Sequence, residues 1–182
     1  MNYSFNFNLE KGIETIVYLS EKLAEPDLYR ILKIIYFANK EHLEKYGRFI
    51  CGDSYIAMEH GPVSSEIYNL FNAVKGEKVW ISNEAISQAK ASFTVEDQYK
   101  IKDIRSPNLD IFSDSDLECL NYALEQYSSL SLDELEHLSH DEAWKTTNKN
   151  AVIDIEKIVA TLNNQQELIS HLQDQYPGEA EW

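Results

Sequence analysis

The sequence predicts a predominantly helical α+β protein, built as a single compact domain of about seven helices with a small antiparallel β-sheet. Apolar residues recur at helical spacing through seven segments, whereas strand-like alternation appears only within residues 54–59 and 92–103. These strands do not alternate regularly with helices, which argues against a doubly wound parallel sheet. With 182 residues, of which 43% are apolar and 12% aromatic, the chain can bury one sizeable core.

The first two predicted helices lie over residues 10–23 and 27–46. Each repeats apolar side chains at intervals of three or four, which places these side chains on one helical face. Pro26 stands at the start of the second helix, where its missing N–H costs no hydrogen bond. We expect Gly47 to end this helix, because glycine readily adopts the left-handed conformation of a C-terminal cap.

A short strand is predicted over residues 54–59, and a Gly-Pro pair follows it. Because glycine and proline interrupt regular structure, we expect Gly61 and Pro62 to end the strand and to fix a turn that leads into a helix. Ser64 is the expected N-cap of that helix, which ends near Gly76.

The middle of the chain combines a segment without clear periodicity and two predicted strands. The pattern of residues 77–91 is ambiguous. Two strands follow, over residues 92–96 and 99–103, and we expect Asp97 and Gln98 to join them as a hairpin, because both segments alternate in polarity.

Helices account for the rest of the sequence, over residues 114–127, 131–138, 140–147 and 154–174. Ser131 and Glu134 have the spacing of a capping box, which marks a helix start. The helix over residues 114–127 is expected to bury Leu117, Leu120, Leu124 and Tyr127. In the last helix Gln165 and Gln166 interrupt the apolar stripe. We divide the chain into a main domain over residues 1–150 and a C-terminal helix with an acidic tail over residues 151–182, packed on the same domain.

The net charge of −15 is spread unevenly. Residues 1–105 carry 13 Lys or Arg against 15 Asp or Glu, whereas residues 106–142 carry ten acidic residues and no Lys or Arg. Since nucleic-acid phosphates are bound through Lys and Arg, we expect no direct nucleic-acid binding. Two interpretations stay open: the acid attracts a basic partner, or it only keeps the protein soluble.

The expected location is the cytoplasm. The chain has no run of 18 apolar residues that could span a membrane, and its first residues lack the basic and apolar regions of a signal peptide. We therefore expect no membrane partner. Cys51 and Cys119 fit a reducing compartment and define no disulfide framework.

Few residues form a pattern typical of catalysis, and we expect no enzymatic activity, no cofactor and no metal. No phosphate-binding loop, dinucleotide glycine pattern or HExxH motif is present. His137 and His140 lie three residues apart near Asp141, so a metal-dependent enzyme that uses this segment stays open as a remote alternative. Cys51 with His60 as its base is a second candidate pair, but a small buried residue is the favoured role of Cys51.

Histidine and tyrosine side chains are the remaining candidates for a recognition surface. His60 is either presented at a rigid turn or, as we favour, bonded to backbone groups near the next helix. Tyr36 and Phe37 are adjacent on a helix, so one is expected to pack inward while the other lines a groove. Tyr46, Tyr55 and Tyr68 add phenol groups, which are enriched at interfaces, although core packing must explain most of them.

An ordered series of motifs resembles the Panacea domain, the SocA-like antitoxin domain. The series begins in the second predicted helix and ends before the last helices. The matching motifs are Leu32-Lys33, Tyr36-Phe37-Ala38, Tyr46-Gly47, Asp53-x-Tyr55-x-Ala57, Gly61-Pro62-Val63 with His60 before it, Tyr68, and His140-x-x-x-Trp144. The resemblance covers about residues 10–150 and includes a fold that is mainly helical with a small sheet, as the periodicity also predicts.

This resemblance implies a bacterial or phage-associated antitoxin. Members of the family neutralise co-encoded toxins of unrelated kinds by direct binding, so a cognate toxin is the expected partner. The alternative is a SocA-like proteolytic adaptor that delivers its toxin to a ClpXP-type protease. The motif residues are expected to act first as scaffold, with Asp53 pinning the Gly-Pro turn. Toxin specificity is then expected in the acidic helices after residue 105.

Overall fold

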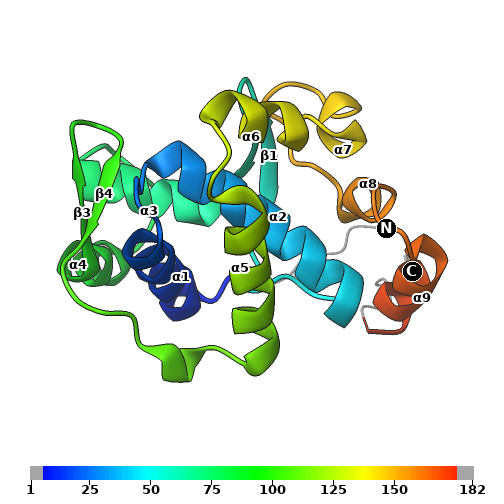
Figure 1. The fold of residues 1–182 in the computed structure, drawn as a ribbon, viewed down its shortest axis with the longest axis horizontal. Coiled ribbons are helices and arrows are strands. Elements are labelled where there is room, and N and C mark those ends of the chain that lie inside the picture. The colour runs from blue at the N-terminus through cyan, green and yellow to red at the C-terminus, as the bar shows by residue number, and fades with distance from the viewer. Residues whose placement is uncertain (1–5, 176–182) are drawn as a thin grey trace.

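Helix α2 (Leu28–Tyr46) runs through the middle of the molecule, and the other elements pack around it. The structure is a computed structural model that describes residues 6–175; the end of the predicted C-terminal segment over residues 151–182 lies outside this range. Figure 1 shows α5 (Asp114–Tyr127) crossing α2. Of all the helices, α5 makes the most extensive contact with α2. The described chain is therefore organised around one buried helix.

The described residues form nine α-helices, one short 3-10 helix and two two-stranded antiparallel sheets, as the sequence predicts for a mainly helical α+β protein. The remaining elements are α1 (Leu9–Lys22), β1 (Tyr55–Met58), β2 (Gly61–Ser64), α3 (Ser65–Lys75), α4 (Asn83–Ser92), β3 (Phe93–Glu96), β4 (Lys100–Asp103), η1 (Leu109–Ile111), α6 (Leu132–Ser139), α7 (Glu142–Lys145), α8 (Ile155–Val159) and α9 (Gln165–Gln175). Two helices more than expected arise from α4, in the ambiguous segment, and from the division of the last predicted helix.

Local signals set most helix boundaries where they were expected. Asp27 caps α2 by accepting a hydrogen bond from the N–H of Arg30, and Gly47 ends this helix at a φ of +69°. Complete capping boxes open α5 at Ser113 and α6 at Ser131. Each of these caps satisfies backbone groups that the helix itself leaves without partners.

The Gly-Pro pair does not form a turn that leads from the strand into a helix, contrary to the prediction. Gly61 and Pro62 begin strand β2, which pairs with β1 through a turn at Glu59 and His60. Gly61 has a φ of +105°, a conformation that glycine adopts far more readily than other residues do. Residues 150–153 lie along the other side of β1, so both edges of that strand are hydrogen-bonded.

The residue that caps α3 also differs from the prediction. Ser64 occupies the N-cap position, but its side chain makes no capping hydrogen bond. Instead Asp53, which precedes β1, accepts hydrogen bonds from the N–H groups of Glu66 and Ile67, each at 3.0 Å. Asp53 therefore fastens the start of the hairpin to the first turn of α3, whereas the sequence placed its contacts at the Gly-Pro pair.

The second hairpin forms as expected. Strands β3 and β4 pair antiparallel, and Asp97 and Gln98 in the turn have φ values of +48° and +69°. Two successive left-handed residues match the right-handed twist of a hairpin. The two hairpins are separate sheets, whereas the sequence indicated one.

The last predicted helix is two helices. α8 ends at Val159, and Asn163 and Asn164 then turn toward the end of α2, where both side chains bind Glu44. Asparagine side chains that bond to nearby groups compete with helix formation, which explains the break. α9 begins at Gln165, one of the two residues that interrupt the apolar stripe.

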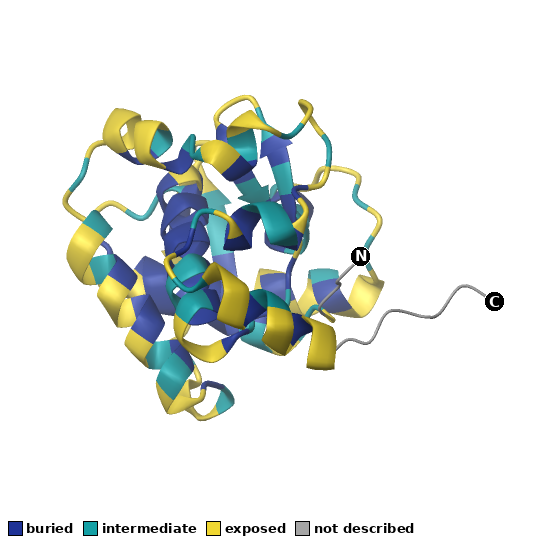
Figure 2. Cartoon of the chain, turned by 90° about the vertical axis from the view of Figure 1, so that its right-hand side faces the viewer, coloured by how far each residue is buried: buried dark blue, intermediate teal, exposed yellow. Residues whose placement is uncertain are grey.

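Burial follows the expected stripes except on α5. Figure 2 shows the buried residues gathered inside the molecule and the exposed ones on its rim. On α5 the buried apolar residues are Cys119, Leu120 and Ala123, whereas Leu117, Leu124 and Tyr127 are only half-buried. The inward face is thus rotated toward smaller side chains, which lets α5 approach α2 closely.

The contacts of Asp53 give a stability prediction. Replacing Asp53 with Ala should lower the free energy of unfolding by about 2–3 kcal/mol, because buried N–H groups lose a charged acceptor. Ser64→Ala is the control and should cost less than about 1 kcal/mol, since Ser64 caps nothing. Urea denaturation measures both, and a larger loss for Ser64→Ala would contradict the capping role of Asp53.

Candidate partner-binding site

Several residues of the motif series meet at the end of the β1–β2 hairpin. Lys33 comes from α2, His60 and Gly61 from the hairpin, and His140 from the segment after α6. A side-chain atom at Gly61 would touch the Lys33 ammonium, the Ser139 hydroxyl and the His140 ring. Gly61 therefore lies against side chains from α2 and from the end of α6, which are more than a hundred positions apart in the sequence.

Lys33 lies at the bottom of this cluster with only 5% of its surface exposed. Its Nζ donates a hydrogen bond to the carbonyl oxygen of His60. Burial lowers the pKa of Lys33 to about 8, while the carboxylate of Glu136 acts in the opposite direction. The Lys33 side chain thus connects α2 to the hairpin turn, and its ammonium loses its proton at a pH that unfolding experiments can reach.

His60 does not bind backbone groups near α3, contrary to the favoured prediction. Its side chain is 63% exposed, and its Nδ1 lies 3.2 Å from Oε2 of Glu136 on α6. The hairpin therefore presents this imidazole at the surface, which is the alternative that the sequence left open. The contact joins the hairpin turn to α6.

His140 and Trp144 stack face to face, with ring centroids 3.8 Å apart and an interplanar angle of 5°. Trp144 donates from Nε1 to the carbonyl oxygen of Met58, so the stack is tied to β1. Burial lowers the pKa of His140, which favours its neutral form. The His-x-x-x-Trp motif therefore packs the α6–α7 junction against the first hairpin.

Asp141, which follows His140, accepts hydrogen bonds from two side chains of α2. Its Oδ2 accepts from the Tyr36 hydroxyl at 2.8 Å and from Nζ of Lys40 at 2.7 Å, and its Oδ1 caps α7. Burial and the adjacent Asp141 carboxylate raise the pKa of Tyr36, so this phenol stays protonated as a donor. Asp141 holds α7 against α2.

A pocket of about 270 Å³ opens above Lys33, between α2, the β1–β2 turn and α6. It is lined by Tyr29, Lys33, His60, Leu132, Asp133 and Glu136, and we name it the Lys33 pocket. Tyr29 and Leu132 leave 39% and 41% of their surface exposed, respectively, and the ring of Tyr99 lies 5.3 Å from that of Tyr29. The pocket thus has apolar walls at the surface and charged groups at its bottom and rim.

The remaining motif residues are not part of the lining of the pocket. Tyr36 and Phe37 are both buried, so the prediction that one of them lines a groove is wrong. Tyr36 packs edge-on against Tyr55, and Phe37 stacks on Tyr127. The others lie at the far end of α2 (Tyr46, Gly47), before β1 (Asp53), in β2 (Pro62, Val63) and on α3 (Tyr68).

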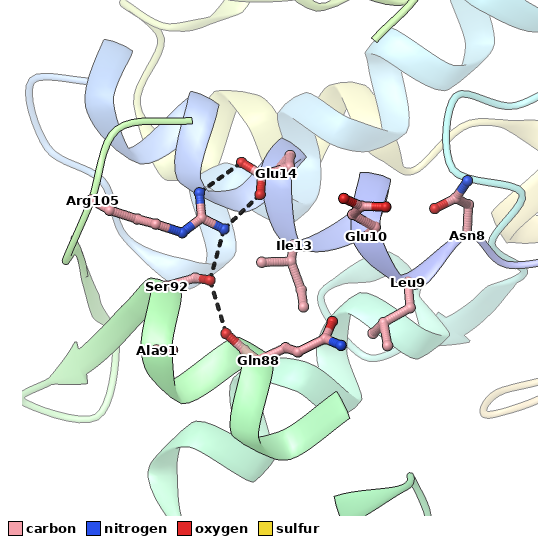
Figure 3. A pocket seen from close by; sticks show the side chains of 9 residues that line it. All are labelled: Asn8, Leu9, Glu10, Ile13, Glu14, Gln88, Ala91, Ser92 and Arg105. Atoms are coloured by element: carbon pink, nitrogen blue, oxygen red, sulfur yellow. Dashed lines mark hydrogen bonds and ion pairs between the residues drawn. The ribbon is translucent and has the colours of Figure 1, made fainter. Parts of the chain in front are cut away.

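A second and larger pocket, of about 650 Å³, lies between α1 and α4 (Figure 3). Two of its charged groups already pair with each other, because the Arg105 guanidinium donates to both carboxylate oxygens of Glu14, at 2.9 and 2.5 Å. Arg105 also donates to the Ser92 hydroxyl, and Glu14 accepts from the N–H of Asn108. This ion pair fastens the segment after β4 to α1, so we regard it as structural.

Several carboxylates of the acidic helices after residue 105 pair with basic side chains of the same molecule. Buried Asp116 on α5 binds Lys11, His42 and Arg48, which come from α1, α2 and the turn after α2. Burial opposes ionisation of Asp116, but the hydrogen bonds from His42 and Lys11 hold its pKa well below its usual range. These acids therefore bind the more basic first half of the chain.

Further pairs follow the same pattern on the surface. Glu118 on α5 binds Lys45 and the Tyr46 hydroxyl. In contrast, the carboxylate of Asp133 at the rim of the Lys33 pocket has no hydrogen bond or ion pair within residues 6–175. Asp133 therefore keeps its charge available to a partner.

The candidates for chemistry have ordinary surroundings. Burial raises the pKa of Cys51 to about 12 and that of Cys119 to about 12, so neither thiol ionises readily. His137 is exposed, and His140 stacks on Trp144. Within the described residues no group of three or more His, Cys, Asp or Glu side chains could hold a metal ion, and no helix is long and apolar enough to cross a membrane.

Four pocket residues did not emerge from the sequence: Tyr29, Leu132, Asp133 and Glu136. The capping box at Ser131 fixes where α6 begins, so it also fixes that Asp133 and Glu136 share a helical face at a spacing of three. Their position opposite Lys33 depends on the packing of α6 on α2, which no local pattern encodes.

Gly61 gives a testable prediction about this packing. Gly61→Ala should lower the free energy of unfolding by about 2 kcal/mol or more, because the new methyl group would meet Lys33 and Ser139 at a positive φ. Gly76 is the matched control, since it has a φ of +86° but nothing within 4 Å. Gly76→Ala should cost only about 1 kcal/mol in thermal or urea unfolding; equal losses would contradict the close approach at Gly61.

The pKa of Lys33 predicts a pH dependence. The folded protein releases this proton near pH 8, whereas the unfolded chain releases it near the ordinary pKa of 10.5. Between these values the unfolded state binds more protons, so stability rises with pH. From pH 7.5 to 9.5, wild-type stability should therefore rise by about 1–2 kcal/mol relative to Lys33→Met. A constant difference in urea unfolding over this range would contradict a lowered Lys33 pKa.

Comparison with known proteins assigns this chain to a family. No curated protein and no solved structure gives a match to the chain. The model of one family, described as antitoxin SocA-like, Panacea domain, matches residues 31–145, a span that includes Lys33, the first hairpin and the His140–Trp144 stack. Because this span is more than half of the chain, the protein belongs to the SocA-like antitoxin family and carries its Panacea domain.

Proposed function

We propose that this protein is the antitoxin of a toxin–antitoxin system and neutralises a co-encoded toxin by binding it directly. Its membership of the SocA-like antitoxin family is the observation that carries this proposal. The site of action is the surface around the Lys33 pocket. The proposal places the protein in the cytoplasm of a bacterium, in a phage-associated system, with binding rather than catalysis as its activity.

The surface around the pocket supports a role in protein binding. Tyr29, Tyr99 and Leu132 come from three different elements and remain 39%, 46% and 41% exposed. Exposed aromatic side chains are enriched at protein–protein interfaces, in which an apolar centre is surrounded by a polar rim. A stable interface usually buries about 800 Å² on each partner, so the pocket would be the centre of a larger contact.

The way in which the surface is built also favours binding without large rearrangement. Lys33, Gly61 and Glu136 connect α2, the hairpin turn and α6 through short contacts, which fixes the relative positions of the pocket walls. A preformed surface loses little conformational entropy when it binds, which increases affinity.

Co-expression with the product of the adjacent gene tests this function. The neighbouring protein alone should arrest growth, and co-expression with this chain should restore plating by at least about a hundredfold. The two proteins should also co-purify as a stable complex. A neighbour that is harmless alone, or one that stays toxic in the presence of this chain, would contradict the proposal.

The same experiment separates masking from proteolytic delivery. If the antitoxin masks its toxin, the half-life of the toxin should stay the same or lengthen when both proteins are present. A half-life that shortens, and that recovers when ClpX is deleted, would instead support an adaptor for a ClpXP-type protease.

A further inference from the structure

We propose that the Lys33 pocket binds an arginine side chain of the protein partner. The proposal rests on the proposed function insofar as the partner is a protein toxin. It deepens that function by naming the group recognised and the residues that recognise it, and it follows from the shape, the walls and the charges of the pocket.

The walls suit a side chain that is apolar along its stem. Tyr29 and Leu132 stand on two sides of the opening and are exposed, so their apolar surface is available to a guest. An arginine side chain has three methylene groups before its guanidinium, and these can pack on apolar walls while the charge remains beyond them. A pocket of about 270 Å³ accommodates one such side chain.

The charges in the pocket favour a cation. Its lining contains two carboxylates, Asp133 and Glu136, against the single ammonium of Lys33. Lys33 is 5% exposed and donates to the His60 carbonyl, so its charge is directed into the protein. Asp133 has no ion pair among the described residues, whereas the Glu136 carboxylate lies against the imidazole of His60 and also acts electrostatically on Lys33.

The surroundings strengthen this preference. The segment that supplies Asp133 and Glu136, residues 106–142, contains no Lys or Arg, and the whole chain has a net charge of −15. An anionic guest would have to approach two carboxylates through this field, whereas a cation is attracted over distances comparable to the Debye length.

Arginine fits the arrangement better than lysine. The guanidinium is planar and can stack on the exposed ring of Tyr29 while it donates to carboxylates at the rim. Asp133 and Glu136 lie three residues apart on α6 and so share one side of that helix, which allows one guanidinium with five N–H donors to reach both. A lysine ammonium can neither stack in this way nor present a flat set of donors.

Titration with a small probe tests the pocket without any toxin. N-acetyl-L-arginine amide, added to the ¹⁵N-labelled protein, should shift the NMR signals of His60, Leu132 and Glu136 in a saturable manner. The neutral analogue N-acetyl-L-citrulline amide has nearly the same shape and should shift them at least about fivefold less at equal concentration. Equal shifts with both, shifts elsewhere only, larger shifts with N-acetyl-L-aspartate amide, or no shifts would overturn the proposal.

Matched variants connect the pocket to the partner. Asp133→Asn with Glu136→Gln should abolish the arginine-dependent shifts and weaken binding of the purified toxin at least about tenfold. Asp114→Asn with Glu125→Gln removes the same charge from α5, with Asp114 in its first helical turn as Asp133 is in that of α6. This control pair should change toxin affinity less than about threefold, and circular dichroism should show that both variants are folded.

The outcomes separate the two proposals. If the wild-type protein neutralises its toxin and the pocket variant binds the toxin as tightly as the control, the arginine pocket is wrong and the antitoxin function stands. If the neighbouring gene product is not toxic, the proposed function fails, and the NMR titration still decides whether the pocket binds arginine.

Discussion

A helix that is buried on nearly all sides needs partners for its polar groups, and most of those on α2 find their partners in other parts of the fold. Buried Arg30 donates to the carbonyl oxygens of Ser128 and Leu130, in the connection between α5 and α6. Buried Asn39 donates to the Tyr55 hydroxyl and accepts from the N–H of Ile50. Leaving such groups unpaired would cost about 1–3 kcal/mol each, so these bonds specify how the elements assemble.

The Lys33 pocket is a consequence of the same constraint. A buried ammonium needs acceptors, and the hairpin turn supplies one through the His60 carbonyl, which brings the turn down onto α2. Only a glycine at position 61 allows this approach. Glu136 then reaches His60 from α6 and closes the third side. Two residues of the motif series, Lys33 and His60, therefore line the pocket beside Gly61, whereas the rest of its lining comes from residues outside the motif.

Local signals in the sequence predicted much of the fold, and long-range partners account for the rest. Capping at Asp27 and Ser131 and the turn at Asp97 depend on neighbours within three or four residues, so these features were predictable. Asp53 replaces Ser64 as the cap of α3 from across a strand pair, and Glu136 meets His60 over 76 positions. The charge of the acidic segment has the same limit as a signal, because a formal charge does not reveal that Asp116 is buried against Lys11 and Arg48.

The central claim is that the surface assembled by α2 around Lys33 is the one that the toxin covers. Hydrogen–deuterium exchange of the protein alone and with saturating toxin tests it most directly. Backbone amides of residues 59–62, 97–101 and 132–139 should gain protection, because they form the hairpin turns and the helix around the pocket. Amides of α4 and α9 should exchange as before. Protection confined to α4 or α9, with none around the pocket, would contradict the claim.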